Sequence, residues 1–129
     1  MSDISFHGCV VPGLGLGRKI GFPTFNLDAR PDLPFGVYAV NAVFNPESAV
    51  SHHALMHYGP KPTVGRSDIF CEIYFLKFPD GFDVREMTIH VLDKLRDVMK
   101  FDTLEALVVQ MKHDEQEAKQ KYFLSSNPL

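Results

Sequence analysis

Short runs of β-branched and aromatic residues alternate with glycine, proline, asparagine and aspartate along the first four-fifths of the chain. Helical periodicity is missing from this part, so the pattern is typical of an antiparallel barrel or sandwich. It predicts strands over residues 6–11, 36–44, 53–58, 69–78 and 87–95, with turns at 45–46, 59–60 and 79–81. Five or six such strands would close a small barrel, so the expected fold class is mainly β.

The hydrophobic period changes in the last segment of the chain. Apolar residues fall on one helical stripe there, formed by Leu104, Leu107, Val108, Met111, Ala118 and Tyr122. Asp102 and Glu105, three residues apart, form a start that is similar to a capping box. We therefore expect one C-terminal helix packed on the barrel. Nothing indicates a linker or a repeat, so residues 1–129 are interpreted as a single domain.

The composition of the chain limits the classes of partner that it is expected to bind. The 129 residues are 45% hydrophobic and 12% aromatic, which is enough for a real core, and the formal net charge is -3. Because the longest basic run is the pair Arg18-Lys19, no nucleic-acid partner is expected. The N-terminus does not resemble a signal peptide, and no apolar run approaches the roughly 20 residues of a membrane span. We expect a cytoplasmic monomer with no membrane partner, in which Cys9 and Cys71 are buried reduced thiols.

Residues 13–26, GLGLGRKIGFPTFN, join a glycine-rich basic loop to a tight Pro-Thr-Phe-Asn turn. Gly13, Gly15 and Gly17 allow backbone amides to approach an anion, and Arg18 and Lys19 can neutralise it. The spacing matches neither G-x-G-x-x-G before a helix nor G-x-x-x-x-G-K-S/T. A nucleotide bound at this loop would therefore be held in a different way.

Thr24 and Asn26 lie two residues apart in an extended segment, so both side chains point to the same side. A hydroxyl and an amide oxygen arranged in this way can bind one magnesium ion, which keeps waters and phosphate oxygens as its other ligands. The alternative is ordinary turn chemistry, in which both side chains bond to local backbone.

Glu72 stands in the middle of the apolar run IFCEIYFLKF. Strand periodicity places it on the same side as Phe70, Tyr74 and Leu76, where a carboxylate is costly unless it is paired. One interpretation is a general base tuned by its apolar setting, and the other is a structural ion pair or a residue turned to solvent at a sheet edge.

Other polar clusters give weaker hypotheses. His53 and His57 lie four residues apart with His52 beside them, but four residues of strand span about 13 Å, which does not favour a shared zinc ion. Residues 59–63, GPKPT, form either one wall of a site or a plain corner. Arg96 and Phe101 flank a loop that could cover a planar ligand or be simple surface.

These motifs together resemble the riboflavin kinase family. The resemblance rests on G-x-G-R-x-x-G-F-P-T-x-N at 15–26, P-x-G-V-Y-A-V at 34–40, G-x-x-P-T at 59–63, Glu72, and K-F-D-T-L-E-A-L at 100–107. The resemblance extends from about residue 6 to about residue 122. It implies a six-stranded Greek-key barrel with a C-terminal helix, in agreement with the fold expected from periodicity.

The resemblance also implies an activity, which is transfer of the ATP γ-phosphoryl group to the terminal ribityl hydroxyl of riboflavin, giving FMN and ADP. It implies that Thr24 and Asn26 bind magnesium, or another divalent cation, and phosphate, and that Glu72 is the catalytic base. Residues 13–19 would cover the nucleotide. The flavin would lie beside Arg96, Phe101 and Leu104.

Three positions depart from the family pattern: Leu16, Phe25 and His57. These departures are interpreted as touching the nucleotide side. They support an alternative in which the chain is a catalytically weak or inactive flavin- or nucleotide-binding regulatory module. In many bacteria the kinase module is joined to an FMN adenylylation domain, which has no counterpart in this sequence, so FAD synthesis is expected to need another protein unless the chain is an excised domain.

Overall fold

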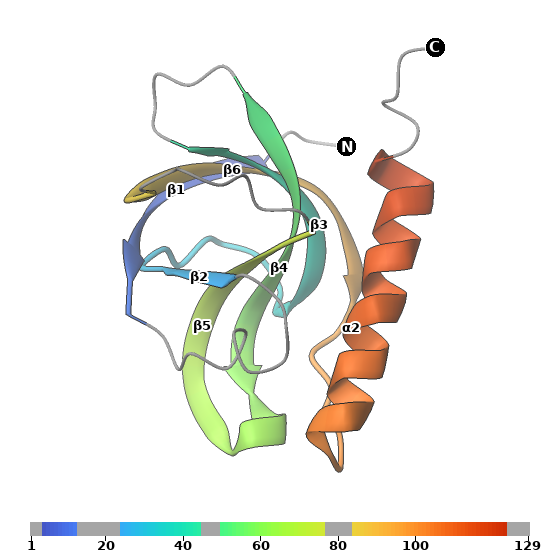
Figure 1. Ribbon diagram of the computed structural model, residues 1–129. Coiled ribbons are helices and arrows are strands. Elements are labelled where there is room, and N and C mark those ends of the chain that lie inside the picture. The colour runs from blue at the N-terminus through green and yellow to red at the C-terminus, as the bar shows by residue number, and fades with distance from the viewer. Residues whose placement is uncertain (1–3, 13–23, 45–49, 77–83, 124–129) are drawn as a thin grey trace.

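The computed structural model describes residues 4–12, 24–44, 50–76 and 84–123. Within these ranges six antiparallel strands close into one barrel in the order β1-β2-β5-β4-β3-β6 (Figure 1). The strands are β1 (Ile4–Val11), β2 (Thr24–Leu27), β3 (Gly36–Phe44), β4 (Ser51–Lys61), β5 (Arg66–Phe75) and β6 (Glu86–Arg96). The expected mainly β barrel with a C-terminal helix is confirmed.

The strand order is a Greek key. Strands β3, β4 and β5 are neighbours in sequence and in the sheet, while β6 returns to pair with β3 and then with β1. The short strand β2 fills the remaining place between β1 and β5. The sequence had indicated a tight turn at this point, and the extended conformation of residues 24–27 corrects that interpretation.

A turn was also expected at Gly59-Pro60, and this was wrong because β4 continues to Lys61. The ladder between β4 and β5 is irregular between Gly59 and Lys61, which admits a proline into the strand. Gly59 has a φ of 131°, and an added Cβ would lie 2.9 Å from the Phe35 ring. The chain turns instead at η1 (Pro62–Val64). The other two expected turns, at 45–46 and 79–81, lie outside the described residues.

Alternation along the strands fills the barrel interior with apolar side chains. The central cluster includes Val40, Ala42, Met56, Ile73, Phe75, Met87 and Ile89. Burying one large apolar side chain contributes about 1.5–3 kcal/mol, so this cluster supplies much of the driving force for closure. Tyr74 on the opposite face of β5 and Leu76 directly after this strand belong to a second cluster outside the barrel.

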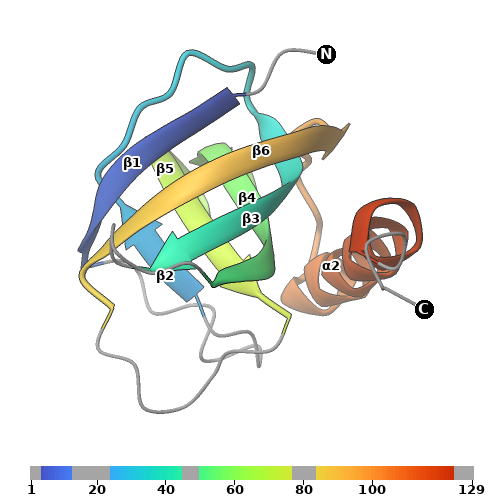
Figure 2. The same ribbon diagram turned by 90° about the horizontal axis from the view of Figure 1, so that it is seen from above.

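The outer cluster lies between the barrel and α2 (Leu104–Ala118), which runs along one side of the strands (Figures 1 and 2). The helix begins after Thr103, whose Oγ1 accepts a hydrogen bond from the Ala106 amide at 3.1 Å. The N-cap is therefore Thr103, one residue later than the Asp102 expected from the sequence. Helical structure continues as η2 (Lys119–Phe123), whose Tyr122 hydroxyl donates to Asp93.

Two further expectations concern the cysteines and the membrane. Cys71 is buried, as expected, but Cys9 is exposed on β1, so the expectation of two buried thiols was wrong for Cys9. No helix in the described ranges is both long enough and apolar enough to span a bilayer.

Candidate active site

A pocket opens between the outer face of the barrel and α2. Strands β4, β5 and β6 form one side of it, while η1, the loop after β6 and the helix form the other. Its lining consists of His57, Lys61, Pro62, Thr63, Val64, Glu72, Tyr74, Arg96, Met99, Phe101, Leu107 and Met111. Most of this surface is apolar, and the charged groups gather on the barrel side.

Glu72 reaches the pocket wall from β5 and is 1% exposed. Its Oε1 forms an ion pair with the Lys61 ammonium and accepts a hydrogen bond from the Tyr74 hydroxyl at 2.8 Å. Burial, followed by the charge of Glu72, raises the pKa of Tyr74 well above its usual value, so Tyr74 stays a donor. The structural ion pair is therefore present and an orientation toward solvent is excluded, while the role of general base stays a prediction.

Asn26 lies directly across the sheet from Glu72, and His57 is its neighbour on the other side. Side chains at such positions share one face, and their Cβ atoms are about 5 Å apart. Asn26 is 8% exposed, and its Oδ1 is the one buried side-chain N or O atom without a hydrogen-bond partner in the described part of the chain. Thr24 pairs with Tyr74 in the same ladder, so Thr24 and Asn26 point to one face as expected.

A second hollow lies beside Asn26, on the side of the barrel where β1, β2 and β5 meet. Its lining includes Asn26, Arg30, Asp68 and Phe70. Asn26 therefore lies next to Glu72 in the sheet and also borders this separate hollow. The candidate nucleotide residues Gly13, Gly15, Gly17, Arg18 and Lys19, together with Leu16, lie outside the described residues.

Arg96 and Asp114 connect the barrel to the helix above the pocket. The Arg96 guanidinium contacts the Asp114 carboxylate through Nε at 3.0 Å and Nη2 at 2.9 Å, and Gln110 donates to the same carboxylate. Arg96 also lies over the Phe101 ring, 5.8 Å from its centroid, and the Phe101 amide donates to Thr63. These contacts hold the loop after β6 against η1.

Only two of the three expected flavin contacts line the pocket. Arg96 and Phe101 line the pocket, whereas Leu104 is 40% exposed and is not part of the lining. The helix contributes Leu107 and Met111 in its place. Both residues were on the predicted helical stripe, so the signal existed, but the sequence did not indicate which part of the stripe meets the pocket. Residues 59–63, expected to form either one wall of a site or a plain corner, contribute Lys61, Pro62 and Thr63 to the pocket wall. The sequence predicted no role for the side chains of Lys61, Tyr74 and Asp114.

The structure describes two of the three residues that depart from the family pattern, Phe25 and His57. The partly buried Phe25 packs against the core inside the barrel, with its ring in a T-shaped contact with Phe75 at 5.8 Å. His57 lines the pocket, and its Nε2 donates to the Pro60 carbonyl at 2.8 Å. Phe25 therefore lies in the core and His57 lies beside Glu72, and the interpretation that these changes touch the nucleotide side stays a prediction.

The two other histidines of the cluster at 52–57 have structural partners. His53 bonds to Asn41 at 2.8 Å and stacks on Phe123, and His52 stacks on Phe44. No group of three or more histidine, cysteine or acidic residues suited to a metal ion occurs among the described residues.

The closed barrel, the helix beside it and the pocket with its buried carboxylate are typical of a small-molecule-binding domain. The family model described as riboflavin kinase (Flavokinase) matches residues 1–122. The chain belongs to the riboflavin kinase family.

Individual relatives agree with this assignment. The chain is 40% identical over 109 residues to the RNA-binding riboflavin kinase RibR of Bacillus subtilis, covering 83% of this chain and 46% of that protein. It is 31% identical over 123 residues to the bifunctional riboflavin kinase/FMN adenylyltransferase of Escherichia coli K12, covering 94% and 39%. A solved structure described as a macrolide-efflux protein from Streptococcus pneumoniae superposes with a TM-score of 0.74 at 30% identity, covering 92% and 39%. The chain thus spans less than half the length of these proteins.

Proposed function

We propose that this domain is a riboflavin kinase, which transfers the ATP γ-phosphoryl group to the terminal ribityl hydroxyl of riboflavin and releases FMN and ADP. The observation that carries the proposal is the pairing of Asn26 with Glu72 across the sheet. It places an unpartnered amide oxygen beside a buried carboxylate that faces a ligand pocket. In a member of this family, that arrangement suits a metal and phosphate site next to a base.

Glu72 is the proposed catalytic base. Phosphoryl transfer requires mainly positioning of the reactants and stabilisation of charge, with a carboxylate to accept the hydroxyl proton. Glu72 is fixed for this role, because Lys61 and Tyr74 both contact Oε1. The apolar surroundings exclude water from the reacting hydroxyl, which favours transfer to riboflavin over hydrolysis of ATP.

Thr24 and Asn26 are the proposed magnesium ligands. A buried amide oxygen with no hydrogen bond is unfavourable unless something binds it, and a divalent cation satisfies it. The side chains therefore fit the ion. When bound, magnesium would neutralise charge on the phosphate oxygens. We further propose that residues 13–19 cover the nucleotide.

The pocket is the proposed flavin site. The isoalloxazine ring is planar and apolar over much of its area, and Met99, Phe101, Leu107 and Met111 offer a matching surface. A ring bound there would direct the ribityl chain toward Glu72 on the barrel side. No observation in the described residues favours the inactive regulatory alternative.

RNA binding is not proposed for this chain. The word RNA-binding belongs to the name of a relative, of which this chain matches 46%. With a net charge of -3, the chain lacks the basic balance that binding to a polyanion requires. The cytoplasmic location and the monomeric state remain predictions.

Incubation with riboflavin, ATP and magnesium, followed by chromatographic separation of the flavins, tests the proposal. FMN and ADP should appear in equal amounts, and chelation of the divalent ion should stop the reaction. Absence of FMN with ATP and with every other nucleoside triphosphate would overturn the proposed activity.

A further inference from the structure

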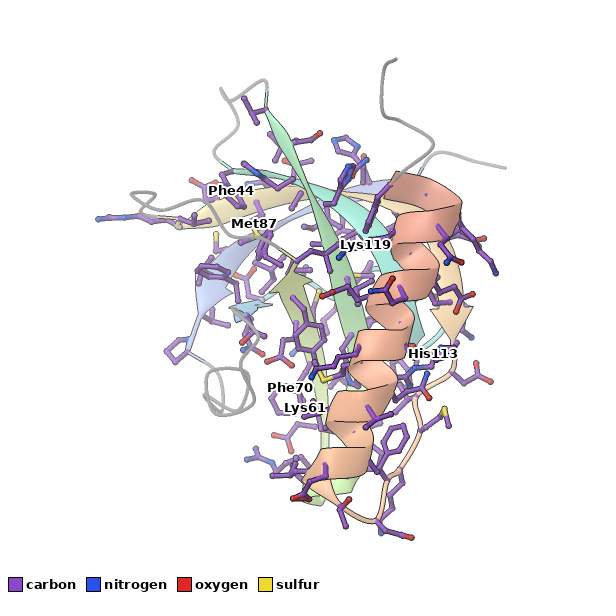
Figure 3. All side chains as sticks on the ribbon, turned by 45° about the vertical axis from the view of Figure 1, so that its right-hand side comes forward. Phe44, Lys61, Phe70, Met87, His113 and Lys119 are labelled. Carbon is purple, nitrogen blue, oxygen red and sulfur yellow. The ribbon has the colours of Figure 1, made fainter. Side chains whose placement is uncertain are left out.

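Lys61 is an unusual cation, because its side chain is buried at the end of β4 and is 8% exposed. Its ammonium contacts Glu72 and also lies 4.8 Å from the centroid of the Phe70 ring (Figure 3). Glu72 faces the flavin pocket, while Phe70 borders the hollow beside Asn26. Lys61 therefore lines the flavin pocket beside Glu72 and also contacts an aromatic ring that borders the second hollow.

The proposed reaction brings a second negatively charged group close to Glu72. The ribityl oxygen gives its proton to Glu72 and bonds to the γ-phosphorus, while the bond from that phosphorus to the bridging oxygen breaks and ADP leaves with the electron pair. When Glu72 has released this proton to solvent, the phosphate of the product lies next to a carboxylate again. Two neighbouring anionic groups repel each other unless a cation lies between them.

Lys61 is the cation best placed to reduce this repulsion. It is the one basic side chain in ionic contact with Glu72 within the described ranges. Arg96 also lines the pocket, but its guanidinium is held by Asp114 through two nitrogens. A lysine ammonium is a compact charge on a flexible stem, so it can move between neighbouring anions more easily than an arginine fixed in two contacts.

We propose that Lys61 is a phosphate-binding residue of the flavin site, which neutralises Glu72 before transfer and binds the phosphate of FMN after it. This inference rests on the proposed function. It assigns Lys61 a role in distinguishing the phosphorylated flavin from riboflavin, which a purely structural partner of Glu72 would not have.

The test compares FMN and riboflavin binding by quenching of flavin fluorescence, without nucleotide or divalent ion. Lys61→Gln should weaken FMN binding by about tenfold or more while changing riboflavin binding by less than about threefold. Lys61→Arg should keep most of the preference for FMN. Lys121→Gln is the matched control, because Lys121 is exposed and paired with Glu117 on the helix, and it should change neither affinity.

A second pair of variants covers the case in which Lys61→Gln does not fold, since that change leaves Glu72 buried without its cation. Glu72→Gln should bind FMN more tightly than the unchanged protein does, because repulsion is removed and Lys61 is free. Adding Lys61→Gln to Glu72→Gln should abolish that gain. An unchanged ratio of FMN to riboflavin affinity in both lysine variants would overturn the proposal.

Turnover separates this inference from the proposed function. If the unchanged protein forms FMN but the affinity ratio ignores Lys61, only the role of Lys61 is wrong. If the unchanged protein forms no FMN, the proposed kinase activity is wrong. The ratio of FMN to riboflavin affinity still decides whether Lys61 binds the phosphate of the flavin.

Discussion

Asn26 and Glu72 face each other across the ladder between β2 and β5, and their side chains emerge on the same outer face of the barrel. The carboxylate has two partners, whereas the amide oxygen has none among the described residues. An unsatisfied buried polar atom costs stability, so its persistence beside a pocket indicates a functional reason.

Asn26→Ala should reduce activity without reducing stability. The replaced amide oxygen makes no hydrogen bond, so its removal loses none and relieves a desolvation cost of about 1–3 kcal/mol. Thermal unfolding should therefore stay level or rise, while the magnesium concentration needed for half-maximal rate increases about tenfold or more. Asn41→Ala is the control, because Asn41 bonds to His53 at a distance from the pocket, and it should keep its activity. A normal magnesium response in Asn26→Ala would contradict the metal-ligand role.

Glu72→Gln should nearly abolish phosphorylation while riboflavin still binds. General-base catalysis contributes about 10²–10⁴-fold, and glutamine keeps the shape but cannot accept the proton. Steady-state rates and a riboflavin titration measure the two effects separately. Glu115→Gln removes a carboxylate that pairs with Lys119 on the helix, so it should leave the rate unchanged. Equal rates for Glu72→Gln and the unchanged protein would exclude Glu72 as the base.

Breaking the pair between Arg96 and Asp114 should destabilise the protein strongly. Asp114 is 1% exposed, so Arg96→Met would leave a buried carboxylate without its cation at a cost of about 3–5 kcal/mol. Urea denaturation should show this loss, and the double variant Arg96→Met/Asp114→Leu should recover much of it. The exposed pair of Lys121 and Glu117 provides the comparison, since Lys121→Met should cost no more than about 1 kcal/mol. Equal costs for Arg96→Met and Lys121→Met would show that the buried pair does not anchor the helix.

His57 should make the fold sensitive to mild acid. Burial lowers the pKa of its imidazole below the ordinary 6.5, so the folded state favours the neutral ring. Its stabilising contribution is complete above about pH 6.5 and is lost as the pH falls toward the lowered pKa, because the unfolded chain then binds the extra proton. His57→Gln, which can still donate toward Pro60, should lose less thermal stability than the unchanged protein between about pH 7.5 and 5.5. An identical loss in both proteins would assign the acid sensitivity to other groups.

The two cysteines should react at very different rates. Cys9 is exposed, whereas burial raises the pKa of the Cys71 thiol to about 12 and leaves almost no thiolate near neutral pH. A disulfide reagent at about pH 8 should therefore modify one thiol rapidly in the folded protein and the second only after unfolding. Cys9→Ser should remove the rapid phase. Rapid reaction of two thiols in the native state would mean that the barrel opens around Cys71.

The sequence allowed the local features of this site to be predicted, because they depend on short-range periodicity. Alternation placed Glu72 on the face of Tyr74, and the two-residue spacing placed Thr24 with Asn26. The register that brings Asn26 opposite Glu72 was not accessible, because it depends on how distant segments pair when the barrel closes. The role of the Lys61 side chain was missed for a related reason. A Gly-Pro pair usually indicates a turn, and only the irregular ladder at Gly59 keeps the strand going to Lys61.

The helix illustrates the same limit. Its apolar stripe was recognised, but the stripe is longer than the surface it covers, so periodicity alone could not separate the exposed Leu104 from Leu107 and Met111 at the pocket. The N-cap differed by one residue because Thr103 and Asp102 are both good capping residues, and the geometry of the loop after β6 selects between them.

Closure of the sheet has a consequence for how such a domain can be used. Every strand of the barrel in the described ranges has a hydrogen-bonded neighbour on each side, so the sheet offers no open edge on which a foreign strand could add. A closed barrel of this kind can be joined to other domains with little risk that their strands pair with it during synthesis. This property suits a fold that makes up less than half of much longer relatives, in which the same closed unit can be joined to different neighbouring domains.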